Sequence, residues 1–564
     1  MRSLDGFWLP ASLRAGVLEP DAQYVTSSFA GGRPCNSTDE GAVTVRWPLL
    51  SSEQWSRLLD GLRANRRQAP RGQAFWARFE AALGPAGRLL ADPAEPLHDL
   101  ALATLPGYTG YSEAMIRLTL GALDLWTLEQ FASAFALAPG LEATDGWQAM
   151  PGLPGRLRFY GRSRRHPLRR ILPGRRAQPL FGAAQAPELV AGYGAGNVPG
   201  SALLISLLAL ATTLTGTRPP LTIVRNSRRE PIFAPLVLQA LERVDPGLVS
   251  TVALLVWDHG DETVEAGLLP RTDLAIAAAG DEAIAQIRAS LERAAGPSAR
   301  FHAHGHKVSF SAIGREVLAL GLQAGPGGPP LLDVVTLLAA LDSAFWDQHG
   351  CLSSRVHFVQ DGGEGCARPR DYARRLAEQL GLLAAYLPRG NWPRSWLRDR
   401  FDRYKLLEQT GKVHVLSAYD DDFLVVLDER PTDATGFAAQ VNDCQGRTVV
   451  VRPVGDLMEV PERYLALLPP AHLQSLSVAA GQPGEGLTEA FLHFAEACGA
   501  RGITAIRTVG RGAFPQLAYS WDGLIPLDLV RTRPPGYFAT IEFDRPYDEM
   551  LDTYRQMLQW NRAM

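Results

Sequence analysis

One cysteine in the sequence lies in a setting suited to nucleophilic chemistry. Cys351 follows the polar segment Asp347–Gly350, between a run of helical spacing at 331–346 and a run of strand character at 355–359. A short polar turn leaves a thiol accessible, and His349 is a candidate for stabilising the thiolate, although it fits a surface position equally well. We therefore predict that Cys351 is a catalytic nucleophile.

Length and composition limit the class of protein. With 564 residues the chain is too long for one hydrophobic core, since single cores stop growing at roughly 250 to 300 residues, so two or three domains are expected. The chain is 46% hydrophobic and 20% charged, with a net charge of -3, which is typical of a soluble globular protein. This composition argues against disorder and against bulk nucleic-acid binding.

The cysteines and the apolar segments indicate a cytoplasmic setting. The five cysteines are odd in number and include no C-x-x-C pair, and the N-terminal residues lack a secretory apolar segment. The most apolar stretch, residues 201–213, is shorter than the ~18 to 20 residues that cross a bilayer, so we predict a buried helix and no membrane span. We predict no metal site. The remaining cysteines, expected to be bystanders, are Cys35, Cys366, Cys444 and Cys498.

Strand-like and helix-like segments alternate between residues 188 and 315, which predicts an open parallel sheet with helices on its faces. Ligands bind such sheets at the carboxyl ends of the strands. The carboxyl ends of two predicted strands suit the binding of a nucleotide. Gly280 precedes a helix beginning near Asp281, and residues 192–200 are rich in glycine without forming the G-x-G-x-x-G fingerprint. Either cluster also fits a plain turn.

A second α/β unit follows the linker 323–330. Its predicted strands and helices surround Cys351, and further strands and helices follow residue 473. The predicted strands are 355–359, 412–416, 422–428 and 447–453, and the predicted helices are 331–346, 371–386 and 395–408.

Nine arginines lie between Arg156 and Arg176. Runs of like charge usually face water, so a solvated loop is the plainer interpretation. Because the arginine fork binds phosphates and carboxylates well, the segment is also a candidate docking surface for an acyl carrier protein or for the phosphates of coenzyme A.

Seven segments, in order along the chain, are Gly107–Ile116, Ala195–Pro199, Ile223–Ser227, Asp273–Ala283, His304–Phe310, Trp346–Cys351, and Trp521–Gly523 with Leu529–Arg531. Together they resemble the LuxC-type fatty acid (acyl-CoA) reductases of bacterial luminescence, in the aldehyde dehydrogenase superfamily. One such match would be chance, but seven in order are specific.

The resemblance implies a reaction path. The acyl group of a fatty acyl-CoA or acyl carrier protein passes to Cys351, and the resulting thioacyl enzyme is reduced by NADPH to an aldehyde. By the same resemblance, Asn197 and the backbone N–H of Cys351 hold the oxyanion, a kind of contact worth roughly 3 kcal/mol. His349 stands where the luminescence enzymes look to carry Gln.

The resemblance also implies positions for the cofactor. Arg225 stands where the superfamily usually has a lysine at the adenosine ribose, and an arginine there favours NADPH, with NADH as the alternative. Ser227 and Gly280 would flank the adenosine and the pyrophosphate. Asp443 falls near the place of a glutamate at the nicotinamide ribose.

One departure from the superfamily pattern bears on the reaction. The glutamate that activates water in the acid-forming members is replaced by Ala303. An aldehyde-forming enzyme benefits from lacking this base, because water would destroy the thioacyl intermediate. The sequence therefore favours a reductase. The alternatives are a cysteine-dependent acyltransferase or thioesterase without redox chemistry, and a non-catalytic partner that binds carrier protein.

The resemblance predicts an aldehyde dehydrogenase-like α/β fold, with a Rossmann-type cofactor domain and a second α/β catalytic domain. We expect residues 1–100 to form an N-terminal extension packing on the core. Residues 101–322, completed by about 474–564, would bind the cofactor, and 323–473 would carry the nucleophile. By analogy with the superfamily, a homo-oligomer is expected.

Overall fold

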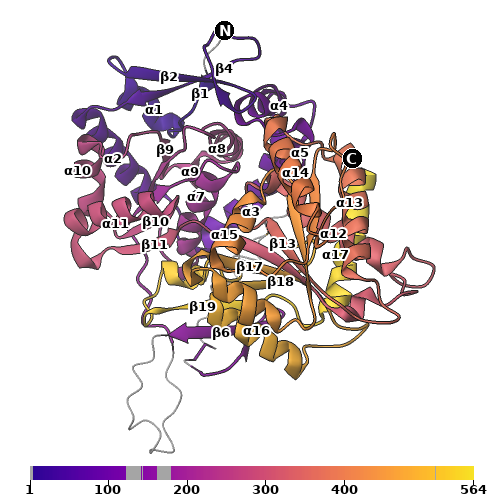
Figure 1. Cartoon of the computed structure of the whole chain (residues 1–564). Coiled ribbons are helices and arrows are strands. Elements are labelled where there is room, and N and C mark those ends of the chain that lie inside the picture. Colours follow the sequence, from indigo (N-terminus) through magenta and orange to yellow (C-terminus); the bar gives the residue numbers. More distant parts are fainter. Residues whose placement is uncertain are drawn as a thin grey trace, which may run out of the picture.

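The structure, a computed structural model, describes residues 4–121, 141–142, 144–161, 180–514, 516 and 518–563. Two parallel-sheet units make up most of the molecule (Figure 1). The magenta elements α7–α11 and β9–β11 lie on one side of the view, and the orange and yellow elements from α12 onward lie on the other. This arrangement confirms the predicted α/β fold with a Rossmann-type sheet.

The first unit is a five-stranded, fully parallel sheet in the order β11-β10-β7-β8-β9. Its strands are nearly all buried, as expected for apolar runs covered on both faces by helices. The strands are β7 (Leu189–Tyr193), β8 (Leu221–Arg225), β9 (Val252–Leu255), β10 (Leu274–Ala278) and β11 (Arg300–His304). The helices are α7 (Ser201–Ala211), α8 (Phe233–Val244), α9 (Pro246–Val249), α10 (Glu262–Leu268) and α11 (Asp281–Ala295).

The second unit is a ten-stranded sheet in the order β14-β15-β16-β13-β12-β17-β18-β19-β6-β5. It is parallel except for the pairs β14–β15, β19–β6 and β5–β6. Its strands are β5 (Gln148–Ala149), β6 (Arg156–Gly161), β12 (Val308–Ile313), β13 (Ser354–Gln360), β14 (Val413–Val415), β15 (Leu424–Asp428), β16 (Thr448–Val454), β17 (Leu473–Ala479), β18 (Ala505–Thr508) and β19 (Gly536–Ile541). Its helices are α12 (Leu331–Ala344), α13 (Pro369–Tyr386), α14 (Arg394–Glu408), α15 (Ala434–Asp443), α16 (Glu489–Arg501) and α17 (Pro546–Ala563).

The N-terminal part packs on the first unit. Trp8 exchanges two backbone hydrogen bonds with Leu254, of 2.9 and 2.8 Å, and so extends the β9 edge of the five-stranded sheet. A small sheet contains β1 (Leu4–Asp5), β2 (Gln23–Ala30), β3 (Arg33–Pro34) and β4 (Val43–Leu49). The helices are α1 (Ala11–Leu18), α2 (Ser52–Gln68), α3 (Gly72–Ala91), α4 (Pro96–Thr109) and α5 (Glu113–Gly121).

The sheets divide the chain differently from the expected domain boundaries. Strand β12, expected in the first parallel sheet, pairs with β13 and β17 in the second. Strands β17, β18 and β19 also lie in the ten-stranded sheet, although 474–564 was expected to complete the cofactor domain. Periodicity predicts that a strand forms, but its neighbour is chosen by packing between segments distant in sequence.

Within the described part of the chain, no helix combines the length and the apolar character that a membrane crossing requires. No group of three or more His, Cys, Asp and Glu side chains among the described residues is placed to hold a metal ion.

Candidate active site

The loop that carries Cys351 joins α12 to β13 and has an unusual backbone. Trp346, Asp347 and Gln348 all have positive φ angles, of 51°, 48° and 61°. Each non-glycine residue in this left-handed region costs roughly 1 to 2 kcal/mol. Three in succession persist only where the surroundings hold them in place.

The contacts of Asp347 hold this loop. Its buried carboxylate accepts hydrogen bonds from Arg447 Nε at 2.7 Å, Trp392 Nε1 at 2.9 Å and the Gly390 N–H at 3.0 Å. Its backbone carbonyl accepts from the Gly446 N–H at 2.9 Å. Asp347 and Arg447 are 0% and 1% exposed, so the loop is fastened by a buried ion pair.

The Cys351 backbone is supported from β12 and β17. Ser309 Oγ donates to the Cys351 carbonyl at 2.8 Å, and Ser475 Oγ donates to Ser309 Oγ at 2.8 Å. Burial raises the pKa of the Cys351 thiol to about 11, and the Asp522 carboxylate adds to this, while hydrogen bonding by Gln474 lowers it. At neutral pH the thiol is therefore protonated.

His349 lies in an aromatic setting. Its ring stacks on Trp392, with centroids 4.3 Å apart and planes 23° apart, and meets Tyr111 edge to face at 6.2 Å. Burial lowers the pKa of His349 to about 4, against the opposing effect of Asp347. The imidazole is thus neutral at pH 7 and brings no positive charge to a thiolate. A catalytic role for His349 stays a prediction.

Asn197 connects the two units at this point. It lies in the glycine-rich loop after β7, and its Nδ2 donates to the His349 carbonyl at 2.8 Å. Its own carbonyl accepts a hydrogen bond from the Tyr111 hydroxyl. The structure therefore brings Asn197 against the loop of Cys351, and its role as an oxyanion donor stays a prediction.

Three of the predicted cofactor residues lie at the carboxyl edge of the five-stranded sheet. Arg225 ends β8, and its Nε donates to the Trp257 carbonyl at 2.7 Å. Ser227 packs on the glycine-rich loop, because a Cβ on Gly196 would lie 2.1 Å from its Oγ. Gly280 precedes α11, and a Cβ there would have no neighbour within 4 Å. This open helix N-terminus at the edge fits a pyrophosphate.

Two acidic residues, Asp281 and Glu282, lie in the first turn of that helix. Asp281 Oδ1 accepts from the His306 N–H at 2.8 Å, and its Oδ2 lies 3.1 Å from His472 Nε2. The amide of His306 holds the pKa of Asp281 below its usual value, against the effect of burial and with help from His472.

The remaining predicted positions lie elsewhere. Asp443 ends α15 in the ten-stranded unit and pairs with Arg403 at 3.1 Å. Of the arginine-rich segment 156–176, the described residues include Arg156 and Arg158 on β6, and Arg158 pairs with Glu496 at 2.7 Å. The other arginines lie outside the described residues.

Asp522, whose carboxylate raises the pKa of the Cys351 thiol, forms a pair with His304. His304 Nδ1 bonds to the Asp522 carboxylate, and the His304 ring stacks on Trp521 with centroids 3.3 Å apart. Asp522 and Gly523, with φ angles of 51° and 76°, form a two-residue turn closed by backbone hydrogen bonds between Trp521 and Leu524 of 2.6 and 3.0 Å. Asp-Gly suits such a turn, because both central residues need a positive φ.

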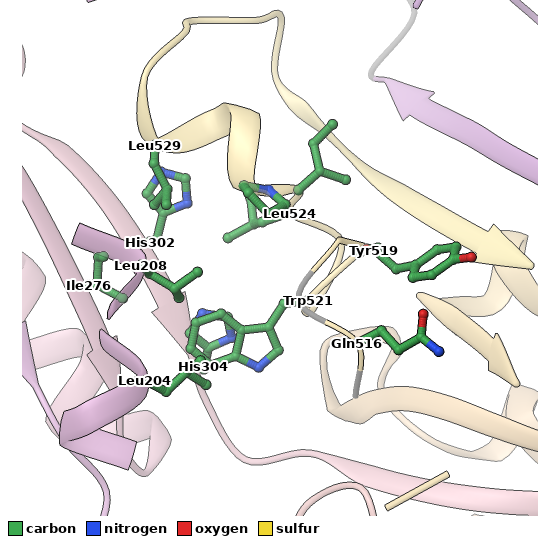
Figure 2. Close-up of a pocket in the computed structure, with 13 residues that line it drawn as sticks. Leu204, Leu208, Ile276, His302, His304, Gln516, Tyr519, Trp521, Leu524 and Leu529 are labelled. Carbon is green, nitrogen blue, oxygen red and sulfur yellow. The ribbon is translucent and has the colours of Figure 1, made fainter. Parts of the chain in front are cut away.

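His304 and Trp521 also line a largely apolar pocket between α7, the five-stranded sheet and the segment after Tyr519. Figure 2 shows Leu204 and Leu208 beside these two rings. The other lining residues are Ile276, His302, Gln516, Tyr519, Ser520, Leu524, Ile525, Pro526 and Leu529.

Several of these residues escaped the sequence analysis. Arg447 and Trp392 carry no motif, and no local pattern links them to Asp347. For Asp522 a signal existed, since Ser520–Leu524 resembles a turn that could line a site and matches the LuxC-type pattern.

Comparisons with known proteins place this geometry in a family. The sequence model of the acyl-CoA reductase (LuxC) family matches residues 163–533. The chain belongs to this family. Comparison with curated protein sequences finds no match.

Solved structures of aldehyde dehydrogenases share the fold of this LuxC-family chain. The Δ-pyrroline-5-carboxylate dehydrogenase of Mycobacterium tuberculosis aligns with a TM-score of 0.52 at 13% identity, over 93% of this chain and 88% of that one. The methylmalonate-semialdehyde dehydrogenase of Oceanimonas doudoroffii aligns with 0.52 at 13%, over 96% and 98%. Aldehyde dehydrogenase 21 of Physcomitrella patens aligns with 0.52 at 11%, over 93% and 96%.

These findings confirm the resemblance and the fold. Family and fold together support an oxidoreductase function related to aldehydes.

Proposed function

We propose that this LuxC-family chain reduces an acyl thioester to an aldehyde through a thioester formed on Cys351. The observation that carries the proposal is the hydrogen bond of 2.8 Å from Asn197 Nδ2 to the His349 carbonyl. This bond ties the glycine-rich loop at the nucleotide-binding edge to the loop of the nucleophile. Thioester and hydride donor would therefore meet at one place.

The first step transfers the acyl group. Cys351 Sγ attacks the carbonyl carbon, the carbon–sulfur bond to the donor breaks, and the donor thiol leaves with one proton. Charge gathers on the carbonyl oxygen during the attack. The Asn197 amide and the backbone N–H of Cys351 are the donors proposed to stabilise this charge.

The second step reduces the thioester. A nicotinamide nucleotide, when bound, supplies the hydride to the acyl carbon. The thiohemiacetal on Cys351 then expels the thiolate of Cys351, which is a good leaving group, and the aldehyde departs. One thioester, one reduced nucleotide and one proton give one aldehyde, one thiol and one oxidised nucleotide.

The residues proposed to hold the nucleotide lie mainly along one edge. Gly280 leaves the N-terminus of α11 open for the pyrophosphate, and Ser227 lies beside the glycine-rich loop. Arg225 favours the extra phosphate of NADPH over NADH through its charge. Asp443 is the proposed contact to the nicotinamide ribose. One structural relative, the Δ-pyrroline-5-carboxylate dehydrogenase of Mycobacterium tuberculosis, has been solved with NAD.

Ala303 supports reduction over hydrolysis. It lies on β11 opposite Ala277, so the position has no carboxylate to activate water. A second candidate function is a cysteine-dependent thioesterase or acyltransferase without redox chemistry. The observation that favours it is the His304–Asp522 pair, since a buried histidine near a thioester can activate water.

A product assay separates the two functions. Purified protein is mixed with a panel of acyl-CoAs, first without nucleotide and then with NADPH. We expect intact mass to show one acyl group on Cys351, and NADPH then to release aldehyde in equal amount to the nucleotide oxidised. Free acid without NADPH oxidation would contradict the reductase. Cys366→Ala, at a partly exposed cysteine, is the matched control for Cys351→Ala.

The donor of the acyl group is open between coenzyme A and a carrier protein. Docking of a carrier protein through Arg156–Arg176 and assembly into a homo-oligomer stay predictions. The same mass assay with acyl carrier protein in place of coenzyme A tests the donor.

A further inference from the structure

The His304–Asp522 pair has unused hydrogen-bonding capacity. A carboxylate accepts, so the bond between Asp522 and His304 Nδ1 requires the proton on Nδ1, and in the neutral imidazole Nε2 is then the acceptor. His304 is 6% exposed, and its Nε2 is buried without a partner, as is Asp522 Oδ1. Buried polar atoms without partners cost free energy, and here two of them belong to one bonded pair whose histidine lines the pocket, which suggests a functional reason.

Asp522 of this pair lies near enough to the Cys351 thiol to raise its pKa. Burial raises the pKa of Cys351, and hydrogen bonding by Gln474 opposes this. Burial also acts to raise the pKa of Asp522, but His304, Lys307 and Gln474 together lower it. Both groups therefore adjoin the same amide on β17. The next residue, Ser475, supports the Cys351 carbonyl through Ser309. Strands β11 and β17 and the turn 521–524 thus converge on the nucleophile.

The substrate side of the pair is apolar. Trp521 covers one face of the His304 ring, and Leu204 and Leu208 of α7 line the same pocket (Figure 2). Such a lining suits a hydrocarbon chain. An acyl chain in this pocket would lie against the His304 and Trp521 rings.

We infer that His304 and Asp522 form an acid–base pair that carries the thiol proton of Cys351 to the departing thiol of the acyl donor. The inference rests on the proposed function. It adds to that function two residues that neither the family resemblance nor the Ala303 position assigns a role.

The thiol proton moves in two steps. As Cys351 Sγ bonds to the acyl carbon, its proton passes to His304 Nε2, and the Asp522 carboxylate stabilises the imidazolium. When the carbon–sulfur bond to the donor breaks, that proton passes to the leaving sulfur. His304 returns to its neutral form, and no other reactant is needed. Because burial keeps the free thiol protonated, the attack needs such a base.

Other titratable and charged groups surround the pair. His302 lies on the same strand, and burial, with the charges of His304 and Arg300, lowers its pKa to about 3. Lys307 helps keep Asp522 ionised. Both groups stay in place in the variants used below.

The test measures acylation of Cys351 by an acyl-CoA, and its alkylation by iodoacetamide, between about pH 6 and pH 10. At neutral pH, His304→Gln is expected to slow acylation by roughly 100-fold or more, the usual contribution of a general base. Asp522→Asn, which keeps a residue that tolerates positive φ, is expected to slow it by about tenfold or more. His98→Gln is the control, since His98 is buried and bonded to the Leu90 carbonyl among the N-terminal helices.

The pH profile separates a base from a structural role. In His304→Gln both rates are expected to rise about tenfold per pH unit, because thiolate formation alone then limits them. The wild-type rates should depend less steeply on pH over the same range, because the base takes the thiol proton. If the rates and pH profiles of His304→Gln equal those of the wild type, the inference is overturned. If no acyl-CoA acylates the wild type, the proposed function fails, while the iodoacetamide profile still tests the pair.

Discussion

Two buried carboxylates lie near Cys351, the proposed nucleophile, and they differ in how fully they are bonded. Asp347 receives hydrogen bonds from Arg447, Trp392 and Gly390, so both of its oxygens have partners. Asp522 Oδ1 has no hydrogen-bond partner, and neither has Nε2 of His304, the histidine that Asp522 binds. A fully bonded carboxylate holds the loop, whereas a partly bonded pair keeps capacity for a reaction.

The two carboxylates are expected to contribute differently to stability and to rate. Removing one member of a buried ion pair leaves an uncompensated charge, which usually costs about 3 to 5 kcal/mol. The unused atoms of the His304–Asp522 pair already cost free energy in the folded state. We therefore expect the first carboxylate to matter mainly for stability and the second mainly for rate.

The largest effect is expected from Cys351→Ala. Without the thiol no acyl adduct forms, so aldehyde output in the coupled NADPH assay should fall to background. The free energy of unfolding should change little, because a small side chain is replaced by a smaller one. Full aldehyde output in this variant would show that neither carboxylate flanks a nucleophile.

Asp347→Ala is expected to lower the free energy of unfolding by about 3 to 5 kcal/mol, because Arg447 is left buried and unpaired. Urea denaturation measures this change. Asp522→Asn is the matched comparison, with less than about 1 kcal/mol expected, since an amide of the same shape replaces the acid. Equal losses of unfolding free energy in the two variants would contradict the proposed difference between the carboxylates.

Asn197→Ala tests the link between the two sheets. Loss of an oxyanion donor typically costs about 3 kcal/mol of transition-state stabilisation, so kcat/KM should fall roughly 100-fold. The decline should be in kcat rather than KM, because the contact strengthens as charge develops. Asn391→Ala, at an exposed asparagine on the loop between α13 and α14, is the control. A pure KM effect would assign Asn197 to substrate binding.

The smallest effect is expected from His349→Gln. Burial lowers the pKa of His349 to about 4 from 6.5, so the unfolded chain binds a proton more readily than the folded one. This histidine therefore reduces stability as the pH falls from 6.5 towards 4. The variant should lose that part of the pH dependence, measured by denaturation at several pH values, and keep most of its activity. A large loss of acylation rate at pH 7 would restore the predicted role in thiolate stabilisation.

Much of the local structure around the site was predictable from the sequence. The helix expected at 331–346 is α12 (Leu331–Ala344), and the strand expected at 355–359 is β13 (Ser354–Gln360). Both follow from periodic burial of apolar side chains, which is a local property. Short elements with weak periodicity, such as β11 and α15, were missed.

The order of motifs also anticipated part of the site. Asn197 bonds directly within the loop of Cys351, 152 residues away in sequence. Cys351 is partly exposed, but its pKa is raised to about 11, so the thiol is protonated at neutral pH rather than the expected thiolate. The sequence around Cys351 contains no sign that Gln474 and Asp522 would surround it.

The sequence by itself determined the family and most of the elements around the site, because apolar periodicity and short motifs are encoded in neighbouring residues. Tertiary structure alone decided which sheet β12 and β17–β19 join, and which groups surround the thiol. Asp347 meets Arg447 across 100 residues, and His304 meets Asp522 across 218. Such pairings arise only when packing removes both groups from water, since a buried charge or polar atom must then find its partner wherever the fold places one.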